Sequence, residues 1–414
     1  MTDVAAPQVP RRTAATNTTE TYGWVERAFH WSLALLIPTN VMLGRIAEHA
    51  PFATDGELAR KALLFSTHKS VGLAIFLVAL VRIAWALSQP RPAPLHPKRR
   101  AETLLAATVH WLLYGSLVLV PLTGWLHHVT TTGFAPIWWP FGQSLPFMPK
   151  DAALSARFAV LHQTFVVLLV LSLALHVAGA VKHAVIDRDA TLARMWRGVD
   201  PGPLPRSHGT ALPALAAAAV WLAALGVGFA RAPEATAGAT VEGASTVAAA
   251  SNWTVSDGAL SITVTQMGQA VTGTFADWQA AIDFAPEARL DGTYGTVEVA
   301  VATGSLTLGS VSDQATGEAF LASGAFPTAV FEAAIRPAEG GDPDYLADGT
   351  LEIRGVSVPV RLPFTLDMDG EAATVAGTVS VDRRDFGMGE SYPDEASVGF
   401  GVSIDVTLTA EPAA

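Results

Sequence analysis

Five apolar stretches of this chain are each long enough to cross a lipid bilayer, which requires about 20 residues. They lie near residues 24–46, 64–88, 104–127, 157–182 and 211–230. Charged residues make up 15% of the sequence, whereas a soluble domain usually has about 25%. The pattern predicts a multi-pass membrane protein, and the length predicts more than one domain.

Basic residues are concentrated in the N-terminal tail and in the loops after the second and fourth apolar stretches. By the positive-inside rule these segments are cytoplasmic, so the fifth stretch carries everything after residue 231 to the outside. Residues 1–20 are polar and lack the apolar core of a cleavable signal peptide, which predicts a disordered cytoplasmic tail. The basic residues are Arg11, Arg12 and Arg27, then Arg91, Lys98, Arg99 and Arg100, and then Lys182, Arg188, Arg194, Arg197 and Arg206.

The two halves of the chain differ in charge and in pattern. Residues 1–231 contain 20 Lys and Arg against 11 Asp and Glu, and residues 232–414 contain 6 against 26. The basic residues lie between apolar runs, which argues against nucleic-acid binding. Residues 231–249 are small and unpatterned, as in a flexible linker. From residue 250 to 412, short segments alternate apolar with small or polar residues, which predicts an all-β barrel or sandwich.

Four histidines lie within or at the ends of the apolar stretches, where ionisable residues are costly and usually functional. His30 is at the cytoplasmic end of the first stretch, and His68 and His162 are at the outer ends of the second and fourth. His176 follows His162 by fourteen residues, which in a helix is about 21 Å along the axis and within about 40° of the same face. Topology therefore pairs His68 with His162 and His30 with His176.

Two histidine pairs stacked in a four-helix bundle would hold two b-type haems. Neutral imidazole is an axial ligand of haem iron, and bundle cores hold such cofactors. Each histidine alone could instead be a hydrogen-bonded structural residue. A zinc or nickel site is another alternative, although it would group its ligands at one depth. The absence of cysteine excludes disulfides, thiolate metal sites and covalent haem attachment.

Other ionisable residues near the membrane have two interpretations each. Arg82, within the second stretch, could extend to the interface or pair with a haem propionate. Lys69, next to His68, could neutralise a propionate or face the lipid headgroups. Four further histidines fit interfacial positions better than ligation: His110, His127, His128 and His183.

Residues 20–198 resemble the bacterial cytochrome b561 family. The matching segments are, in order, AFHWSLALLI, THKSVGLAIFLVALVRIAW, YGSLVLVPLTGW and LHQTFVVLLVLSLALHVAGAVKHAVIDRDATLARM. The resemblance implies four core helices in a bacterial inner membrane, two b haems, and a respiratory function of passing electrons between the quinone pool and an outer donor or acceptor. At least one member resembles a superoxide oxidase that feeds electrons from superoxide to ubiquinone. The implied axial ligands are His30, His68, His162 and His176.

Residues 250–411 resemble the YceI-like family. The matching segments are VTGTFADWQAAIDFAP, GEAFLASGAFPTAVFEA, LEIRGVSVPVRLPFTL and VDRRDFGM. The resemblance implies a lipocalin-like antiparallel barrel with an apolar cavity for isoprenoid chains, quinones among them. In the segment before FLASGAF the family often has His and Arg. Here that segment contains Asp313 and Glu318 but neither His nor Arg, so head-group recognition could differ or be absent. The alternative is a barrel filled by side chains, as small barrels normally are.

The sequence therefore predicts a multi-domain protein. We expect an all-α transmembrane four-helix haem bundle at 21–200, a fifth transmembrane helix at 211–230, and an all-β antiparallel lipocalin-like barrel in the periplasm at 250–412. Its expected cofactors are two haem b, with ubiquinone or another isoprenoid lipid in the barrel. Cleavage near Ala230 would release the barrel, but we expect an intact tether that keeps it close to the outer haem.

The expected function is electron transfer across the membrane between the quinone pool and an unidentified periplasmic donor or acceptor. Two alternatives remain open. In the first, the barrel is a lipid carrier, and the cytochrome serves as its anchor and redox sensor. In the second, the protein is a superoxide oxidase that reduces ubiquinone, for which Lys150 and Arg157 would attract the anion.

Overall fold

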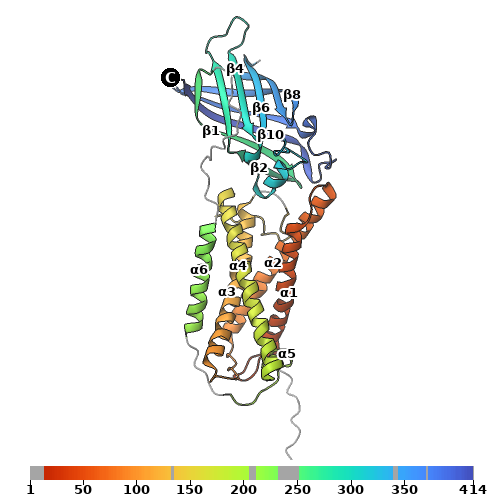
Figure 1. The fold of residues 1–414 in the computed structure, drawn as a ribbon, viewed down its shortest axis with the longest axis vertical. Coiled ribbons are helices and arrows are strands. Elements are labelled where there is room, and N and C mark those ends of the chain that lie inside the picture. The colour runs from red at the N-terminus through yellow and green to blue at the C-terminus, as the bar shows by residue number, and fades with distance from the viewer. Residues whose placement is uncertain are drawn as a thin grey trace, which may run out of the picture.

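The computed structural model consists of a helical bundle with a β-barrel stacked on one end of it (Figure 1). We call this end of the bundle the barrel end and the opposite one the far end. Residues 1–13 of the predicted tail and 232–249 of the predicted linker lie outside the described residues. The structure describes residues 14–131, 135–204, 211–231, 251–338, 344–369 and 372–413.

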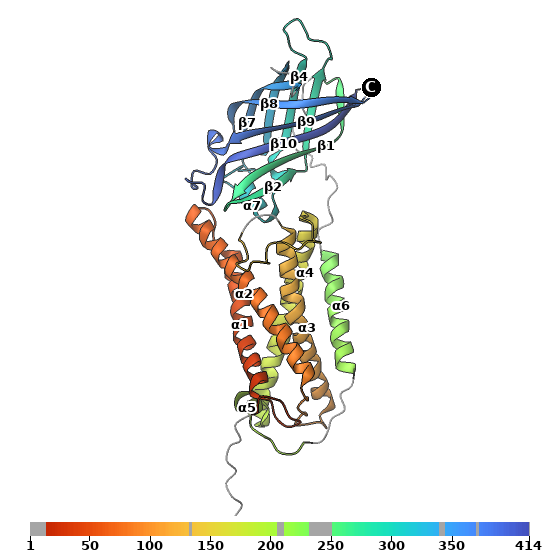
Figure 2. The ribbon, with the colours of Figure 1, turned by 180° about the vertical axis from the view of Figure 1, so that it is seen from behind.

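Among the residues that the structure describes, four long helices form the bundle and a fifth lies against its side. Figure 2 shows the fifth helix, α6, at the edge of the bundle, where it packs on α3 and α4. A π-helical turn, His183–Asp187, and helix α5, Thr191–Arg197, follow α4 at the far end. The long helices are α1 (Trp24–His49), α2 (Asp55–Ser88), α3 (Arg100–Thr130), α4 (Ala152–Lys182) and α6 (Leu212–Arg231).

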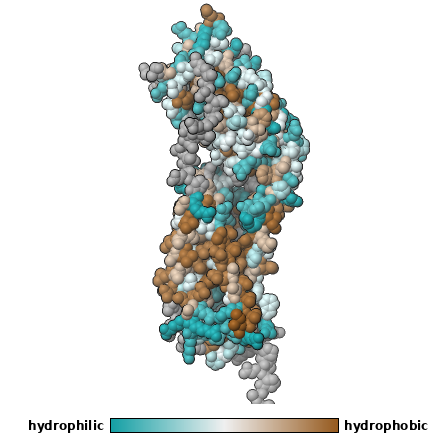
Figure 3. Space-filling model, viewed as in Figure 1, coloured by the Kyte–Doolittle hydropathy of each residue, from teal (hydrophilic) through white to brown (hydrophobic). Residues whose placement is uncertain are grey.

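Apolar side chains cover the middle of the bundle, and polar ones collect at the far end (Figure 3). The helix α1 has 26 residues, about 39 Å at 1.5 Å per residue, but polar residues such as Asn40 and Arg45 interrupt its apolar sequence. That α1 crosses the membrane therefore stays a prediction. Within the described ranges, the helical segments long and apolar enough to cross are Asp55–Ser88, Arg100–Thr130, Ala153–Asp187 and Leu212–Arg231.

The barrel is a closed ring of antiparallel strands, which confirms the predicted fold. In the described part of the chain, eight strands form the ring in the order β1-β10-β9-β8-β7-β6-β4-β3, and β3 returns to β1. The short strands β2 (Gln269–Phe275) and β5 (Leu306–Thr307) extend the sheet from one end of β1. The ring strands are β1 (Trp253–Gln266), β3 (Trp278–Phe284), β4 (Gly295–Ala302), β6 (Thr328–Pro337), β7 (Tyr345–Ile353), β8 (Val356–Asp369), β9 (Ala372–Asp382) and β10 (Val398–Pro412).

The period-two pattern of the sequence places apolar side chains inside the barrel, because successive residues of a strand point to opposite faces. Along β8, Val360, Leu362, Phe364 and Leu366 line the interior. The residues between them face outward, and Arg361 reaches Asp348 of the neighbouring strand at 3.3 Å. The alternation therefore determines which face of the sheet forms the barrel core.

The barrel rests on the connection between α1 and α2. The N–H of Asp55 donates to the carbonyl of Ser391 at 3.1 Å, and the Ser391 hydroxyl donates to the carbonyl of Ala53 at 2.9 Å. The Tyr392 hydroxyl donates to the carbonyl of Phe52. An apolar cluster continues across this contact and contains Leu58, Ala62, Ala135, Val271, Leu306, Leu308, Val311, Tyr392 and Val398.

Arg383 organises the loop that makes these contacts. Its side chain lies inside the barrel, and the residue is 2% exposed. A buried guanidinium must find acceptors for its donors, and here the acceptors are backbone oxygens. They are the carbonyls of Gly399, Met388, Gly389, Tyr392 and Val398, at 2.8–3.2 Å.

Replacing Arg383 by methionine should lower the free energy of barrel unfolding by more than about 3 kcal/mol, because several buried carbonyls lose a charged donor. The matched control is Arg384→Met, whose exposed ion pair with Asp382 should be worth about 1 kcal/mol or less. Hydrogen exchange of barrel amides, followed by mass spectrometry on the full chain, measures both changes. Equal losses for the two variants would contradict the structural role given to Arg383.

Candidate functional site

Two of the predicted ligand histidines face each other near the far end of the bundle. His30 on α1 and His176 on α4 have ring centroids 6.0 Å apart. Two metal–nitrogen bonds of about 2 Å, with about 1 Å from each nitrogen to its ring centre, give a separation of about 6 Å. The observed spacing therefore fits two imidazoles on opposite sides of one haem iron.

The other two predicted ligands, His68 on α2 and His162 on α4, are oriented by the same kind of hydrogen bond. Nδ1 of His68 lies 2.9 Å from the carbonyl oxygen of Asn40 on α1, and Nδ1 of His162 lies 2.9 Å from that of Val120 on α3. A carbonyl only accepts, so each Nδ1 carries the hydrogen. Each Nε2 keeps a free lone pair, which is the form of imidazole that binds a metal.

A glycine lies against each of these two rings. Gly44 and Gly124 each follow, by four residues, the carbonyl that accepts from the histidine. A Cβ atom at Gly44 would lie 2.8 Å from Cε1 of His68, and one at Gly124 would lie 2.9 Å from Cε1 of His162. Such contacts are too short for carbon atoms, so only glycine lets each ring approach the neighbouring helix this closely.

The helix pairs α1–α2 and α3–α4 repeat this arrangement. On α1, His30 precedes Gly44 by fourteen residues, and on α3, His110 precedes Gly124 by fourteen. Each of these histidines is followed by tryptophan. This His-Trp dipeptide at a fixed distance from a glycine is a sequence signal that our sequence analysis missed.

The repeat extends to the second helix of each pair. Arg82 follows His68 by fourteen residues, just as His176 follows His162. The structure brings His110, predicted only as an interfacial residue, next to the far-end pair. Its ring centroid lies 5.0 Å from that of His176, in an edge-to-face arrangement.

Arg82 is paired with an acid that the sequence analysis did not identify. Its Nη2 lies 3.4 Å from Oε1 of Glu26, and the two side chains are only 13% and 5% exposed. The guanidinium also lies over the ring of Tyr114, 5.6 Å from its centroid. Glu26 is one helical turn before His30 on α1, so this buried ion pair lies near the far-end histidines.

Lys69 lies at the barrel end, beside His128. Its Nζ donates to the carbonyl of Ala135 at 3.0 Å and is 3.4 Å from Nδ1 of His128. Nε2 of His128 lies 2.9 Å from Oε1 of Gln143, and Nδ1 of His127 lies 3.0 Å from a carbonyl oxygen of α4. Protein groups thus engage these two histidines, while the role of Lys69 toward a propionate stays a prediction.

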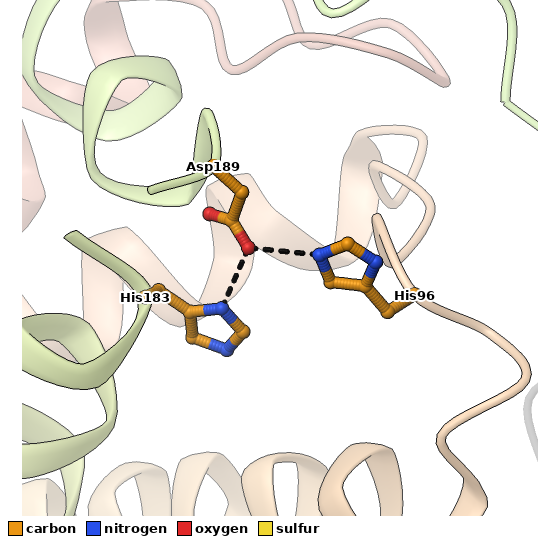
Figure 4. Close-up of side chains that lie close together, drawn as sticks. All are labelled: His96, His183 and Asp189. Atoms are coloured by element: carbon orange, nitrogen blue, oxygen red, sulfur yellow. Dashed lines mark hydrogen bonds and ion pairs between the residues drawn. The ribbon is translucent and has the colours of Figure 1, made fainter. Parts of the chain in front are cut away.

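A group of two histidines and an aspartate lies at the far end and was not predicted (Figure 4). Oδ2 of Asp189 lies 2.9 Å from Nε2 of His96 and 2.7 Å from Nδ1 of His183. The three ligand atoms are close enough together to hold a metal ion, although hydrogen bonds already satisfy them. Burial acts to raise the pKa of Asp189, but hydrogen bonds from Thr191 and the imidazoles lower it to about 2. The ionised carboxylate therefore ties the α2–α3 connection to the end of α4.

The barrel encloses a cavity of about 210 Å³ in the half nearer the bundle. A second cavity of about 100 Å³ continues toward the other end. Aliphatic and aromatic side chains form most of both walls, so the space inside the barrel suits an apolar ligand. Side chains therefore do not fill the barrel core completely. Four residues line both cavities: Val299, Phe331, Leu362 and Val406.

Four polar side chains line the larger cavity: Gln266, Thr303, Gln314 and Arg383. The Thr303 hydroxyl donates to a backbone carbonyl at 2.7 Å, and Arg383 is engaged as described above. Asp313 and Glu318, the acidic residues of the segment before FLASGAF, are exposed. Of these four side chains, Gln266 alone keeps a buried polar atom, Oε1, without a hydrogen-bond partner among the described residues.

Comparison with known proteins divides the chain in the same way. Residues 21–198 match the prokaryotic cytochrome b561 family, and residues 245–411 match the YceI-like domain. The chain is 31% identical, over 185 residues, to cytochrome b561 homolog 2 of Escherichia coli strain K12, and the match covers 44% of this chain and 93% of that protein.

Two solved structures are similar to the barrel. BcnA of Burkholderia cenocepacia is 27% identical, with a TM-score of 0.34, and the match covers 37% of this chain and 95% of that one. A polyisoprenoid binding domain from Saccharophagus degradans is 13% identical, with a TM-score of 0.29, and the match covers 39% of this chain and 99% of that one.

Replacing either His68 or His176 by alanine should remove about half of the bound haem. Each substitution takes one axial ligand from one histidine pair and leaves the other pair complete. His127→Ala is the matched control and should leave the haem content unchanged. The ratio of haem to protein, measured by the pyridine haemochrome assay on purified chains, checks this. A full haem content in either ligand variant would rule out the assigned pairs.

Proposed function

Because the chain belongs to the prokaryotic cytochrome b561 family and carries a C-terminal YceI-like domain, we propose that it is a membrane di-haem b-type cytochrome. It transfers electrons across the bacterial inner membrane, between the quinone pool and a periplasmic donor or acceptor. Its N-terminus is cytoplasmic and its barrel periplasmic, in keeping with the basic residues of the tail and the far-end loops.

Two histidine pairs at two depths of one bundle carry this proposal. His30 and His176 have the spacing of two axial ligands, and His68 and His162 both keep Nε2 free. His162 and His176 are separated along α4 by fourteen residues, or about 21 Å. Each haem, when bound, supplies a one-electron redox centre. Two such centres at these depths would connect the two sides of the membrane.

Two cations lie near the proposed haem ligands. Arg82 lies near the far-end pair, where Glu26 fixes the position of its guanidinium. Lys69 follows His68 directly, and its Nζ lies at the barrel end. We assign both to haem binding, in which they would neutralise propionates that are otherwise costly to bury.

We propose that the barrel holds ubiquinone or another isoprenoid lipid, which exchanges electrons with the His68–His162 haem. The apolar walls of its two cavities suit such a chain. The contacts of Ser391 and Tyr392 with the α1–α2 connection place the cavity near the barrel end of the bundle. A tether would keep the barrel there at high effective concentration.

Ubiquinol mixed rapidly with the oxidised full chain in lipid nanodiscs should reduce its haem, as followed by absorbance. The His162→Ala variant should lose the reduction of the barrel-end centre, whereas His127→Ala should keep it. Superoxide in place of ubiquinol tests the superoxide oxidase alternative. Haem that stays oxidised with both reductants would contradict electron transfer and favour the lipid-carrier alternative.

A protease site inserted between residues 231 and 251 tests the role of the tether. After cleavage and dilution, haem oxidation by a quinone loaded in the barrel should slow, because the reaction becomes bimolecular. The uncut chain at the same dilution is the control. Equal rates before and after cleavage would show that the barrel does not deliver its ligand to the bundle.

A further inference from the structure

A chain of hydrogen bonds runs from the barrel cavity to the helical bundle. Nε2 of Gln266 donates to Oε1 of Gln314 at 3.3 Å, and Nε2 of Gln314 donates to the Tyr392 hydroxyl at 3.1 Å. The hydroxyl donates in turn to the carbonyl of Phe52, in the α1–α2 connection. Gln266, Gln314 and Tyr392 are 3%, 9% and 1% exposed, so water has little access to any of these groups.

The direction of this chain is fixed at its bundle end. The carbonyl of Phe52 has no hydrogen to give, so the Tyr392 hydroxyl must be the donor. Burial raises the pKa of Tyr392, which keeps the hydroxyl protonated at neutral pH. Its oxygen then accepts from the amide of Gln314, and the amide oxygen of Gln314 accepts from Gln266. The hydroxyl of Tyr392 therefore sets the orientation of the Gln314 amide, and Gln314 in turn sets that of the Gln266 amide.

One acceptor is left over at the cavity end. Oε1 of Gln266 is buried and has no hydrogen-bond partner among the described residues. Gln266 lines the larger cavity, whose walls are otherwise apolar or already engaged. A buried amide oxygen without a donor is destabilising, and here a ligand in the cavity is the available source of that donor.

We propose that Gln266 selects a ligand with a hydroxyl group at the end of an apolar chain, and that this hydroxyl donates to Oε1. An isoprenoid quinol has such a donor. The corresponding quinone has only acceptors there and would place one oxygen against another. This inference rests on the proposed lipid-binding function of the barrel, and it makes the reduced form of a quinone the preferred ligand.

The glutamine cannot adapt to a quinone by turning its amide over. Its oxygen would then face Oε1 of Gln314. The Gln314 amide cannot turn over in response, because its orientation is fixed by the hydrogen bond to Tyr392, whose hydroxyl donates to the carbonyl of Phe52. A site whose buried polar group needs a donor discriminates strongly against an analogue that lacks one. The preference thus follows from a contact made by the helical bundle and not from the barrel alone.

A long-chain phenol and its methyl ether test this preference, because they share a tail and differ in the hydroxyl donor. Titration calorimetry of the full chain in lipid nanodiscs should show the phenol binding about tenfold more tightly. Gln266→Leu should remove this difference by weakening the phenol. The matched control is Gln269→Leu, on an exposed residue opposite Gln266 in the β1–β2 register, which should keep the difference.

Tyr392→Phe provides a second variant that leaves the residues of the cavity wall unchanged. Without the hydroxyl, Gln314 loses the group that fixes its amide, so both glutamines can turn over and Gln266 can present its NH₂ group. The ratio of the two affinities should then fall toward one. Unchanged haem content and unchanged hydrogen exchange of barrel amides establish that each variant is folded.

Equal affinities of the phenol and the ether for the unaltered chain would overturn the inference, while the cavity would stand as a lipid site. A preference that persists in Gln266→Leu would overturn it as well. If neither probe binds, the inference and the proposed lipid-binding function of the barrel both fail. A preference that is lost in Gln266→Leu and Tyr392→Phe but kept in Gln269→Leu would establish it.

Discussion

Hydrogen bonds from imidazole Nδ1 atoms to backbone carbonyls join the two helices of each antiparallel pair in the bundle. His68 joins α2 to α1 and His162 joins α4 to α3, each at 2.9 Å, so each antiparallel helix pair has one such bond. In an apolar environment a polar side chain needs a partner within the protein, and glycine is what allows the ring to reach one. The remaining nitrogen of each ring is then available for a metal, and the repeat of this unit creates a two-fold pattern in the site.

The loop that Arg383 stabilises is also the part of the barrel that contacts the bundle. Arg383 holds the loop that follows it through backbone carbonyls, one of which belongs to Tyr392. Tyr392 and its neighbour Ser391 contact the α1–α2 connection. The fold of the barrel therefore positions the two residues that contact the bundle. Their partners are backbone groups of the α1–α2 connection, whose positions depend on the ends of these two helices. Side-chain substitutions in that connection would leave these backbone donors and acceptors in place.

Much of this architecture could be predicted from the sequence, because apolar length and period-two alternation are local properties. The helices, the barrel and the family resemblance all follow from such patterns. The partners of individual side chains could not be predicted in this way. Glu26 meets Arg82 across two helices, and Asp189 joins His96 to His183 from separate connections. The role proposed for Gln266 depends on hydrogen bonds that connect β1, helix α7 (Ser312–Thr316) and the α1–α2 connection. Fixed spacings from histidine to glycine were visible in the sequence, but their meaning depends on which helices are neighbours.

The closing pair of the barrel consists of its first and last strands. β1 pairs with β10 from Trp253 opposite Pro412 to Gln266 opposite Val398, so the ring cannot close before β10 is present. A chain is synthesised from its N-terminus, so β1, with its 14 residues, emerges next to the membrane long before its partner. During that interval it exposes an unpaired strand edge, which is a hazard for aggregation. The biogenesis of this protein would therefore depend on how soon its last strand is synthesised, and a stalled ribosome would leave a barrel open along one seam.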